Sequence, residues 1–376
     1  MSGVNRLGEN RGYLVCEYPH GREHAFLGWY LVRTTRKEDA MANLKLKFAA
    51  QDYEHTRALF DGRVQAEGID LEHVDLFPAV TFERMLVKKE FEVSEMAMTI
   101  YVSSLDLDER PFVAIPVFPV RAFRHSAIYV NANAGIREPN DLIGRRMGEF
   151  VFYGHDAGLW PKGILSSEYG VPHDSYSYFF GGVGHPAPPQ PWVPSRPPAH
   201  IRGEHIGTER TLDAMLESGE IDALMSAVTP PAVLKGSETV RRLFEDFEAV
   251  ERDYFRKTGI FPIMHTLVIR KEVYEQNPWI APALYKAFKE AKALALQRYT
   301  QAAFITHTTF TMPWITAHVA EVRGLLGDDW WPYGLEANRK VLDTFLGYHY
   351  EQGLSKRRYK PEDLFLPEML AEEVSS

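Results

Sequence analysis

The sequence predicts an α/β protein built as two lobes, and three observations support this prediction. The chain has 376 residues, more than a single hydrophobic core usually serves. Between residues 44 and 98, predicted strands and helices alternate, which is typical of a mostly parallel sheet flanked by helices. A further set of predicted strands ends with one that returns the chain to the first lobe. The lobes are expected at 41–132 plus 263–376 and at 133–262.

The composition argues against several classes of function. The fractions of hydrophobic residues (45%) and charged residues (25%) are ordinary for a globular protein. A formal net charge of −9 without a basic tract argues against a nucleic-acid partner. No apolar run is long enough for a transmembrane helix, so no membrane partner is expected. The single cysteine, Cys16, cannot form an internal disulfide and fits a reducing compartment, so we expect a cytoplasmic protein.

The first forty residues differ from the rest of the chain. They carry mixed charge without helical or strand periodicity, whereas a regular alternating strand begins soon after Met41. We therefore expect residues 1–40 to be a disordered N-terminal extension, or to precede a translation start at Met41.

In the first lobe, the apolar patterns predict strands joined by two helices. Asp52 can cap a helix that ends at Phe60, and a second helix is expected over 78–89 with its apolar side chains on one face. The expected strands here and at the passage into the second lobe are 44–50, 68–76, 91–98, 112–118 and 126–130.

The second lobe is expected to mix short helices and strands around one long loop. Proline and glycine are dense between 181 and 207, which predicts an irregular loop that serves as a lid or edge cover. The expected helices are 135–142, 156–169, 211–220 and several from 277 onward, and the expected strands begin near 144 and occupy 221–227 and 266–270.

The stretch 118–131 gives the strongest indication of ligand binding. Arg121, Arg124 and His125 lie between two apolar runs, and an arginine guanidinium matches a carboxylate with two parallel hydrogen bonds. On a regular strand, Arg124 and His125 would point to opposite faces, so both can reach one ligand only if the backbone at 123–125 is irregular. An arginine-rich hairpin at a solvated edge fits the residue types equally well.

Other candidates follow the predicted strands, because open α/β sheets bind ligands at the carboxyl ends of their strands. Each has a structural alternative: Arg57 on an exposed helix face, Glu95 as a helix cap, His265 as a buried core histidine, and Asp156 as the N-cap of a helix. No ligand spacing supports a metal site. These candidates are Gln51, Asp52, Tyr53, Arg57, Ser94, Glu95, Met96, Ser126, Tyr153, His155, Asp156, Thr229 and His265.

Several segments resemble known families. Residues 138–148 and the helix–strand segment 211–224 resemble the type 2 periplasmic binding-protein fold. A closer resemblance, over about 41–370, is to the 4,5-dihydroxyphthalate decarboxylase family. Segment 153–158 and the proline-rich loop after Gly181 depart from that family. The closer resemblance is carried by FVAIPVFP (112–119), FRHSAIYVN (123–131), TGIFPIMH (258–265) and WPYGLEANR (331–339).

The resemblance implies a two-lobed periplasmic-binding-protein-like fold with a ligand crevice between the lobes. It also implies cofactor-independent decarboxylation of a hydroxylated aromatic carboxylic acid in aromatic catabolism, with the phenol of the substrate as electron source. Arg124 suits a carboxylate, with Arg121 or Arg57 as a second clamp. His125 and His265 suit the acid and the base, since histidine titrates near neutral pH, and Glu95 can orient one of them. Tyr153 and Trp160 can stack on the ring.

Two alternative functions fit the same fold. A solute-binding protein of an ABC transporter would capture a small aromatic or other organic anion, but the apolar run expected of an export signal does not precede Cys16. An enzyme of pyrimidine-precursor synthesis would predict a cysteine-rich site, which the sequence lacks. The expected partner is therefore a small aromatic carboxylate, and a homo-oligomer is compatible with the sequence.

Overall fold

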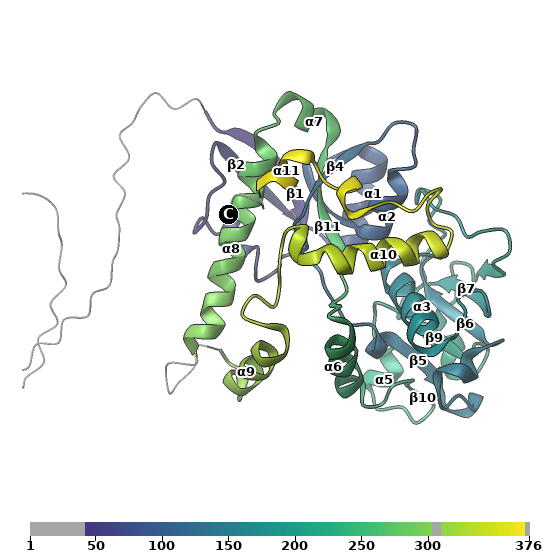
Figure 1. Ribbon diagram of the computed structural model, residues 1–376. Helices are drawn as coiled ribbons and strands as arrows, with labels where there is room; N and C mark the ends of the chain where they lie inside the picture. The colour runs from purple at the N-terminus through teal and green to yellow at the C-terminus, as the bar shows by residue number, and fades with distance from the viewer. Residues whose placement is uncertain (1–41, 303–309, 373–376) are drawn as a thin grey trace, which may run out of the picture. The chain divides into compact units, whose positions relative to one another are not determined.

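The computed structural model describes residues 42–302 and 310–372, and these residues form the predicted α/β fold with two mixed sheets flanked by helices (Figure 1). The prediction for residues 1–40 lies outside the described residues. Within the described ranges, no helix combines the length and apolar character needed to cross a membrane.

The first sheet is built from strands at the beginning of the described chain and one returning strand. β1 pairs in parallel with both β2 and β3, whereas β11 is inserted antiparallel between β3 and β4. β3 is buried along its whole length, as a central strand between helix layers should be. In spatial order the strands are β2 (Ile69–Asp75), β1 (Leu44–Ala50), β3 (Val93–Ala97), β11 (His265–Arg270) and β4 (Phe112–Ile115).

The second sheet takes its strands from the middle of the chain. β9, β6, β7 and β8 run parallel, and β5 lies antiparallel between β9 and β10. β5 belongs to this sheet although it precedes the limit expected at 132; the expected domain limits stay a prediction. The spatial order is β10 (Val240–Arg242), β5 (Ile128–Asn131), β9 (Ala223–Met225), β6 (Arg146–Phe150), β7 (Ser177–Gly181) and β8 (Gly203–His205).

Helices cover the sheets and connect them. Trp160 of α3 packs edge-on against Tyr348 of α10. α10, near the end of the chain, therefore lies against α3, the helix that follows β6 of the second sheet (Figure 1). The helices are α1 (Pro78–Lys88), α2 (Met98–Ser104), α3 (Asp156–Tyr169), α4 (Leu212–Ser218), α5 (Pro231–Leu234), α6 (Phe247–Thr258), α7 (Lys271–Gln276), α8 (Ile280–Ala302), α9 (Ile315–Leu326), α10 (Arg339–Glu351) and α11 (Pro367–Glu372).

Three predictions of local structure were wrong. The helix expected between Asp52 and Phe60 is only the 3-10 turn Arg57–Leu59, because Asp52 pairs with Arg57 and leaves the turn uncapped. The helix expected at 135–142 is reduced to the 3-10 turn Pro139–Leu142. The loop expected to be irregular from 181 to 207 contains β8, which pairs in parallel with β7 at the sheet edge.

Four helices, α2, α5, α6 and α7, were missed altogether, and the first of them lies at the site. α2 begins directly where β3 ends, and all of its side chains are buried. The apolar run through both elements has no turn residue to separate them, so periodicity alone predicts one long strand. The end of β3 and the beginnings of α2, β11 and α3 meet near Ala97 and Thr99, where backbone and side-chain hydrogen bonds join them. This meeting point holds the candidate site.

Candidate active site

A hydrogen-bonded histidine and glutamate link β3 to β11. His265 is paired with Ala97 in the antiparallel ladder, which places its side chain diagonally opposite Glu95 on the same face. The His265 Nδ1 atom is 2.5 Å from Oε1 of Glu95. Because a proton must lie between these two atoms, Nε2 of His265 is left as the nitrogen that can accept a proton.

The carboxylate of Glu95 is held by two further donors. The Tyr53 hydroxyl donates to Oε1 at 2.6 Å, and the backbone N–H of Gln51 donates to Oε2 at 3.3 Å. Burial, with the charge of Glu95, raises the pKa of Tyr53, so its phenol stays a donor. Glu95 itself is fully buried. Its orientation is therefore fixed, and so is that of the imidazole that it holds.

The N-terminus of α3 brings a second carboxyl group to His265. The backbone N–H of Thr99 donates to Oδ1 of Asp156 at 3.0 Å, and Oδ2 lies 4.0 Å from Nε2 of His265. Burial raises the pKa of Asp156 to about 6. One interpretation of the sequence made Asp156 the N-cap of α3. This was wrong, because the side chain of Asp156 accepts a hydrogen bond from Thr99 of α2 instead.

His155 is the residue that caps α3. Its Nδ1 accepts the backbone N–H of Ala157 at 3.1 Å. Burial first, and then the positive charges of Arg124 and His265, lower the pKa of His155 to about 3. His155 therefore stays neutral near pH 7 and borders the site as an uncharged ring, packed edge-on against Phe150 and Phe152.

The turn between β6 and α3 has an unusual backbone conformation. Val151, directly after β6, has a φ of 65°, which is rare for a β-branched residue, and Gly154 has a φ of 87°. The backbone N–H of Gly154 donates to Oε1 of Glu149 at 2.8 Å, and the same carboxylate is paired with Lys162. A buried ion pair thus fixes the turn that positions His155 and Asp156.

Arg124 lies on an irregular segment, as predicted, and offers its guanidinium to the site. Its φ and ψ are −128° and 1°, and it precedes the 3-10 turn His125–Ala127. Nε and Nη2 donate only to the thioether sulfur of Met264, at 3.2 and 2.9 Å, and a thioether is a weak acceptor. In 42–302 and 310–372 no carboxylate forms an ion pair with Arg124. Burial lowers its pKa to about 10, so it stays charged at neutral pH, with Asp156 as its main charged neighbour.

His125 occupies a different environment from that expected. Its ring packs edge-on against Tyr169, Phe244 and Tyr254, and neither ring nitrogen has a hydrogen-bond partner among the residues that the structure describes. Burial lowers its pKa to about 4. The structure thus brings Arg124 and His265 to the same carboxyl group, that of Asp156, while the contacts of His125 are aromatic.

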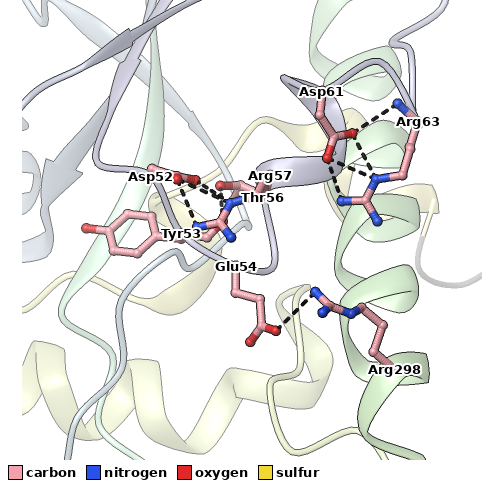
Figure 2. A network of polar contacts seen from close by, with 8 residues as sticks. All are labelled: Asp52, Tyr53, Glu54, Thr56, Arg57, Asp61, Arg63 and Arg298. Carbon is pink, nitrogen blue, oxygen red and sulfur yellow. Dashed lines mark hydrogen bonds and ion pairs between the residues drawn. The ribbon is translucent and has the colours of Figure 1, made fainter. Parts of the chain in front are cut away.

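The two other candidate arginines already have partners. Arg121 is buried and donates to the carbonyl oxygens of Phe261 (3.0 Å) and Pro332 (2.7 Å) and to Oδ1 of Asn338. Arg57 is exposed and paired through Nη2 with Asp52 at 2.8 Å. Figure 2 shows that the ring of Tyr53 points away from the Asp52–Arg57 pair. Both arginines therefore hold local structure in this conformation.

The remaining candidates have backbone or side-chain partners of their own. The Ser94 hydroxyl donates to the carbonyl of Glu95 at 2.7 Å, and the backbone N–H of Ser126 donates to Glu251 at 2.8 Å. The Tyr129 hydroxyl donates to Thr229 at 3.3 Å. Tyr153 lies beneath Lys162, whose Nζ is 3.6 Å from its ring centroid. A role for Ser94, Ser126, Tyr153 or Thr229 in substrate binding stays a prediction.

Sequence reasoning missed the roles that the structure gives to Met264, Glu149 and Lys162. A glutamate within an apolar strand and a lysine within a predicted apolar helix face are the two signals that indicate such a buried pair. Within the described ranges, no group of three or more His, Cys, Asp and Glu side chains is arranged to hold a metal ion.

Two proteins of known activity are similar in sequence to this chain. A 4,5-dihydroxyphthalate decarboxylase from Comamonas testosteroni is 35% identical over 330 residues, which cover 88% of this chain and 98% of the relative. A protein of the same name from Pseudomonas putida is 30% identical over 221 residues, covering 59% and 85% of the two chains. No protein-family model matches the chain.

Solved structures with a similar fold are much more distant in sequence. A sulfonate-binding protein described as part of a putative sulfonate ABC transporter of Methylobacillus flagellatus KT superposes with a TM-score of 0.53 at 15% identity, covering 89% of this chain and 95% of that chain. A Bordetella bronchiseptica RB50 protein superposes with a TM-score of 0.50 at 16% identity, covering 90% and 100%. These likenesses confirm the predicted periplasmic-binding-protein-like fold and carry no information on the ligand.

Proposed function

The chain belongs to the 4,5-dihydroxyphthalate decarboxylase family, and we propose that it removes one carboxyl group from a hydroxylated aromatic acid of the 4,5-dihydroxyphthalate type. As a member of this family it is a carboxy-lyase of aromatic catabolism. The observation that supports the proposed substrate class is the pairing of a cation with an oriented base. Arg124 lacks an ion pair in the described part of the chain, and His265 is held by Glu95 in one tautomer.

Each of these groups has a role in the proposed reaction. Arg124 binds a carboxylate that the substrate retains, through the fork of its guanidinium. His265 takes the phenolic proton on Nε2, and Glu95 stabilises the imidazolium that results. The phenolate then pushes an electron pair into the ring toward the carbon that carries the departing carboxylate. Because the ring supplies the electrons, we propose no cofactor.

Other parts of the expected function stay proposals. His125, with its aromatic surroundings, is the alternative acid or base, and Arg121 and Arg57 are alternative clamps if the ligand displaces their present partners. We also propose that the enzyme acts in the cytoplasm on a small aromatic carboxylate. A homo-oligomeric assembly stays a prediction.

A panel of aromatic acids tests the proposed function. We expect carbon dioxide release from 4,5-dihydroxyphthalate, and binding without turnover for phthalate, which has both carboxylates but no phenol. Release is measured manometrically or by a coupled assay, and binding by calorimetry. Tight binding of the whole panel without any release would favour a solute-binding function instead.

Replacing Arg124 by Lys tests the proposed carboxylate clamp. Lysine keeps the charge but cannot make two parallel hydrogen bonds, so we expect KM to rise by roughly tenfold and kcat to change by less than about threefold. Steady-state kinetics gives both constants. Arg63→Lys, at an exposed ion pair with Asp61, is the matched control and should leave both constants near wild type. An unchanged KM for Arg124→Lys would remove Arg124 from the binding site.

A further inference from the structure

The Oδ2 atom of Asp156 is buried and has no hydrogen-bond partner among the described residues. Its companion Oδ1 accepts the backbone N–H of Thr99 at 3.0 Å, which fixes the carboxyl group. The gap of 4.0 Å between Oδ2 and Nε2 of His265 is too long for a direct hydrogen bond. Oδ2 of Asp156, buried and without a partner, therefore lies beside Nε2 of His265, and such a buried polar atom is costly unless a ligand completes its hydrogen bonding.

We propose that Asp156 is the acid that protonates the ring carbon from which the carboxylate departs. This inference rests on the proposed function, in which His265 accepts the phenolic proton.

The geometry of the two groups supports these separate roles. Nε2 of His265 and Oδ2 of Asp156 lie 4.0 Å apart, so a substrate ring placed against both can give its phenolic proton to His265 and receive a proton on carbon from Asp156.

Protons and electron pairs balance in the proposed step. The phenolic proton moves to Nε2 of His265, and the phenolate oxygen delivers an electron pair into the ring. The ring carbon that carries the departing carboxylate forms a C–H bond with the proton of the Asp156 carboxylic acid. The bond to the carboxylate then breaks, carbon dioxide leaves, and its electron pair restores the aromatic ring. His265 returns its proton to the phenolate, and solvent supplies one proton to Asp156 in each cycle.

The surroundings of Asp156 decide how the acid depends on pH. The groups that face it are His265 from β11 and Arg124 from the segment before β5, while Thr99 from α2 contributes a backbone N–H and His155 precedes it on its own helix. Burial raises the pKa of Asp156 to about 6, above the usual range of aspartate, although the hydrogen bond from Thr99 and the charge of Arg124 oppose the shift. The acid form is lost as pH rises through that pKa, so we expect kcat to fall above about pH 6.

Asp156→Asn tests the acid directly. The amide oxygen of asparagine still accepts the N–H of Thr99, but the side chain cannot supply the proton. We expect kcat to fall by about a hundredfold or more, binding of phthalate to change by less than about threefold, and the decline of kcat above pH 6 to disappear. Asp141→Asn is the matched control, because Asp141 accepts two backbone N–H groups in an exposed 3-10 turn.

The outcomes separate this inference from the proposed function. If wild type releases carbon dioxide and Asp156→Asn does so within threefold of its rate, the assignment of the acid is wrong and the proposed function stands. If the wild type releases no carbon dioxide from any member of the panel, the proposed function fails and this inference fails with it.

Discussion

Replacing His265 by Asn is expected to lower kcat by about a thousandfold while the binding of phthalate survives. The magnitude follows from general base catalysis, which contributes roughly two to four orders of magnitude. The imidazole is held by Glu95 at 2.5 Å and only 11% of its side chain is exposed, so a water molecule does not readily take its place. Steady-state kinetics with 4,5-dihydroxyphthalate, beside calorimetric binding of phthalate, separates loss of turnover from loss of binding.

His125→Asn is the informative comparison for that experiment. If the aromatic surroundings of His125 make it a packing residue, kcat should stay within about threefold of wild type, while stability falls because the ring packs against three aromatic side chains. A hundredfold loss of kcat in His125→Asn, together with normal turnover in His265→Asn, would reverse the two assignments.

The fold could be predicted from sequence to the extent that elements are bounded by turn residues. α3 begins at Asp156 and ends before Gly170, as its pattern predicts, and the strand Leu44–Ala50 agrees with its alternation. The predicted boundaries of strands and helices were wrong where tertiary contacts override the local sequence pattern. β3 and α2 form one apolar run, and only the hydrogen bonds of β3 to β11 and β1 decide where the strand stops.

The candidate site could be predicted only in part, for a related reason. The residue types of Arg124, His265 and Glu95 indicated the chemistry, but the sequence does not show which cations are already paired. Arg121 and Arg124 are three residues apart and alike in type. Backbone oxygens and Asn338 accept the hydrogen bonds of Nη1 and Nη2 of Arg121, whereas Arg124 faces a thioether. Partners that lie more than a hundred residues away in the chain decide this difference.

The buried ion pair of Glu149 and Lys162 connects stability to the site. Both side chains are fully buried, and Nζ is 2.9 Å from each carboxylate oxygen. Gly158 has no room for a Cβ, which would lie 2.0 Å from Oε1 of Glu149. The pair therefore replaces apolar packing between β6 and α3, and its carboxylate also holds the turn at Gly154. Removing one partner leaves an uncompensated charge, which typically costs about 3–5 kcal/mol.

Lys162→Met is accordingly expected to lower the free energy of unfolding by about 3–5 kcal/mol at pH 8. Burial already raises the pKa of Glu149, and loss of the lysine removes the main charge that opposes this rise. A carboxyl group whose pKa is higher in the folded than in the unfolded state favours folding when it is protonated. The deficit should therefore shrink as pH falls toward about 4, the ordinary pKa of glutamate. Urea denaturation of wild type and variant at the two pH values measures it.

Two further variants decide whether the charge or the packing of Lys162 matters. Lys257→Met removes an exposed partner of Glu168 and should cost less than about 1 kcal/mol at either pH. The double variant Glu149→Gln with Lys162→Met keeps an acceptor for the N–H of Gly154 and leaves no buried charge. It should recover more than half of the lost free energy of unfolding and lose the pH dependence. A double variant that is as unstable as Lys162→Met at pH 8 would show that the lysine acts by packing against Tyr153 rather than by neutralising Glu149.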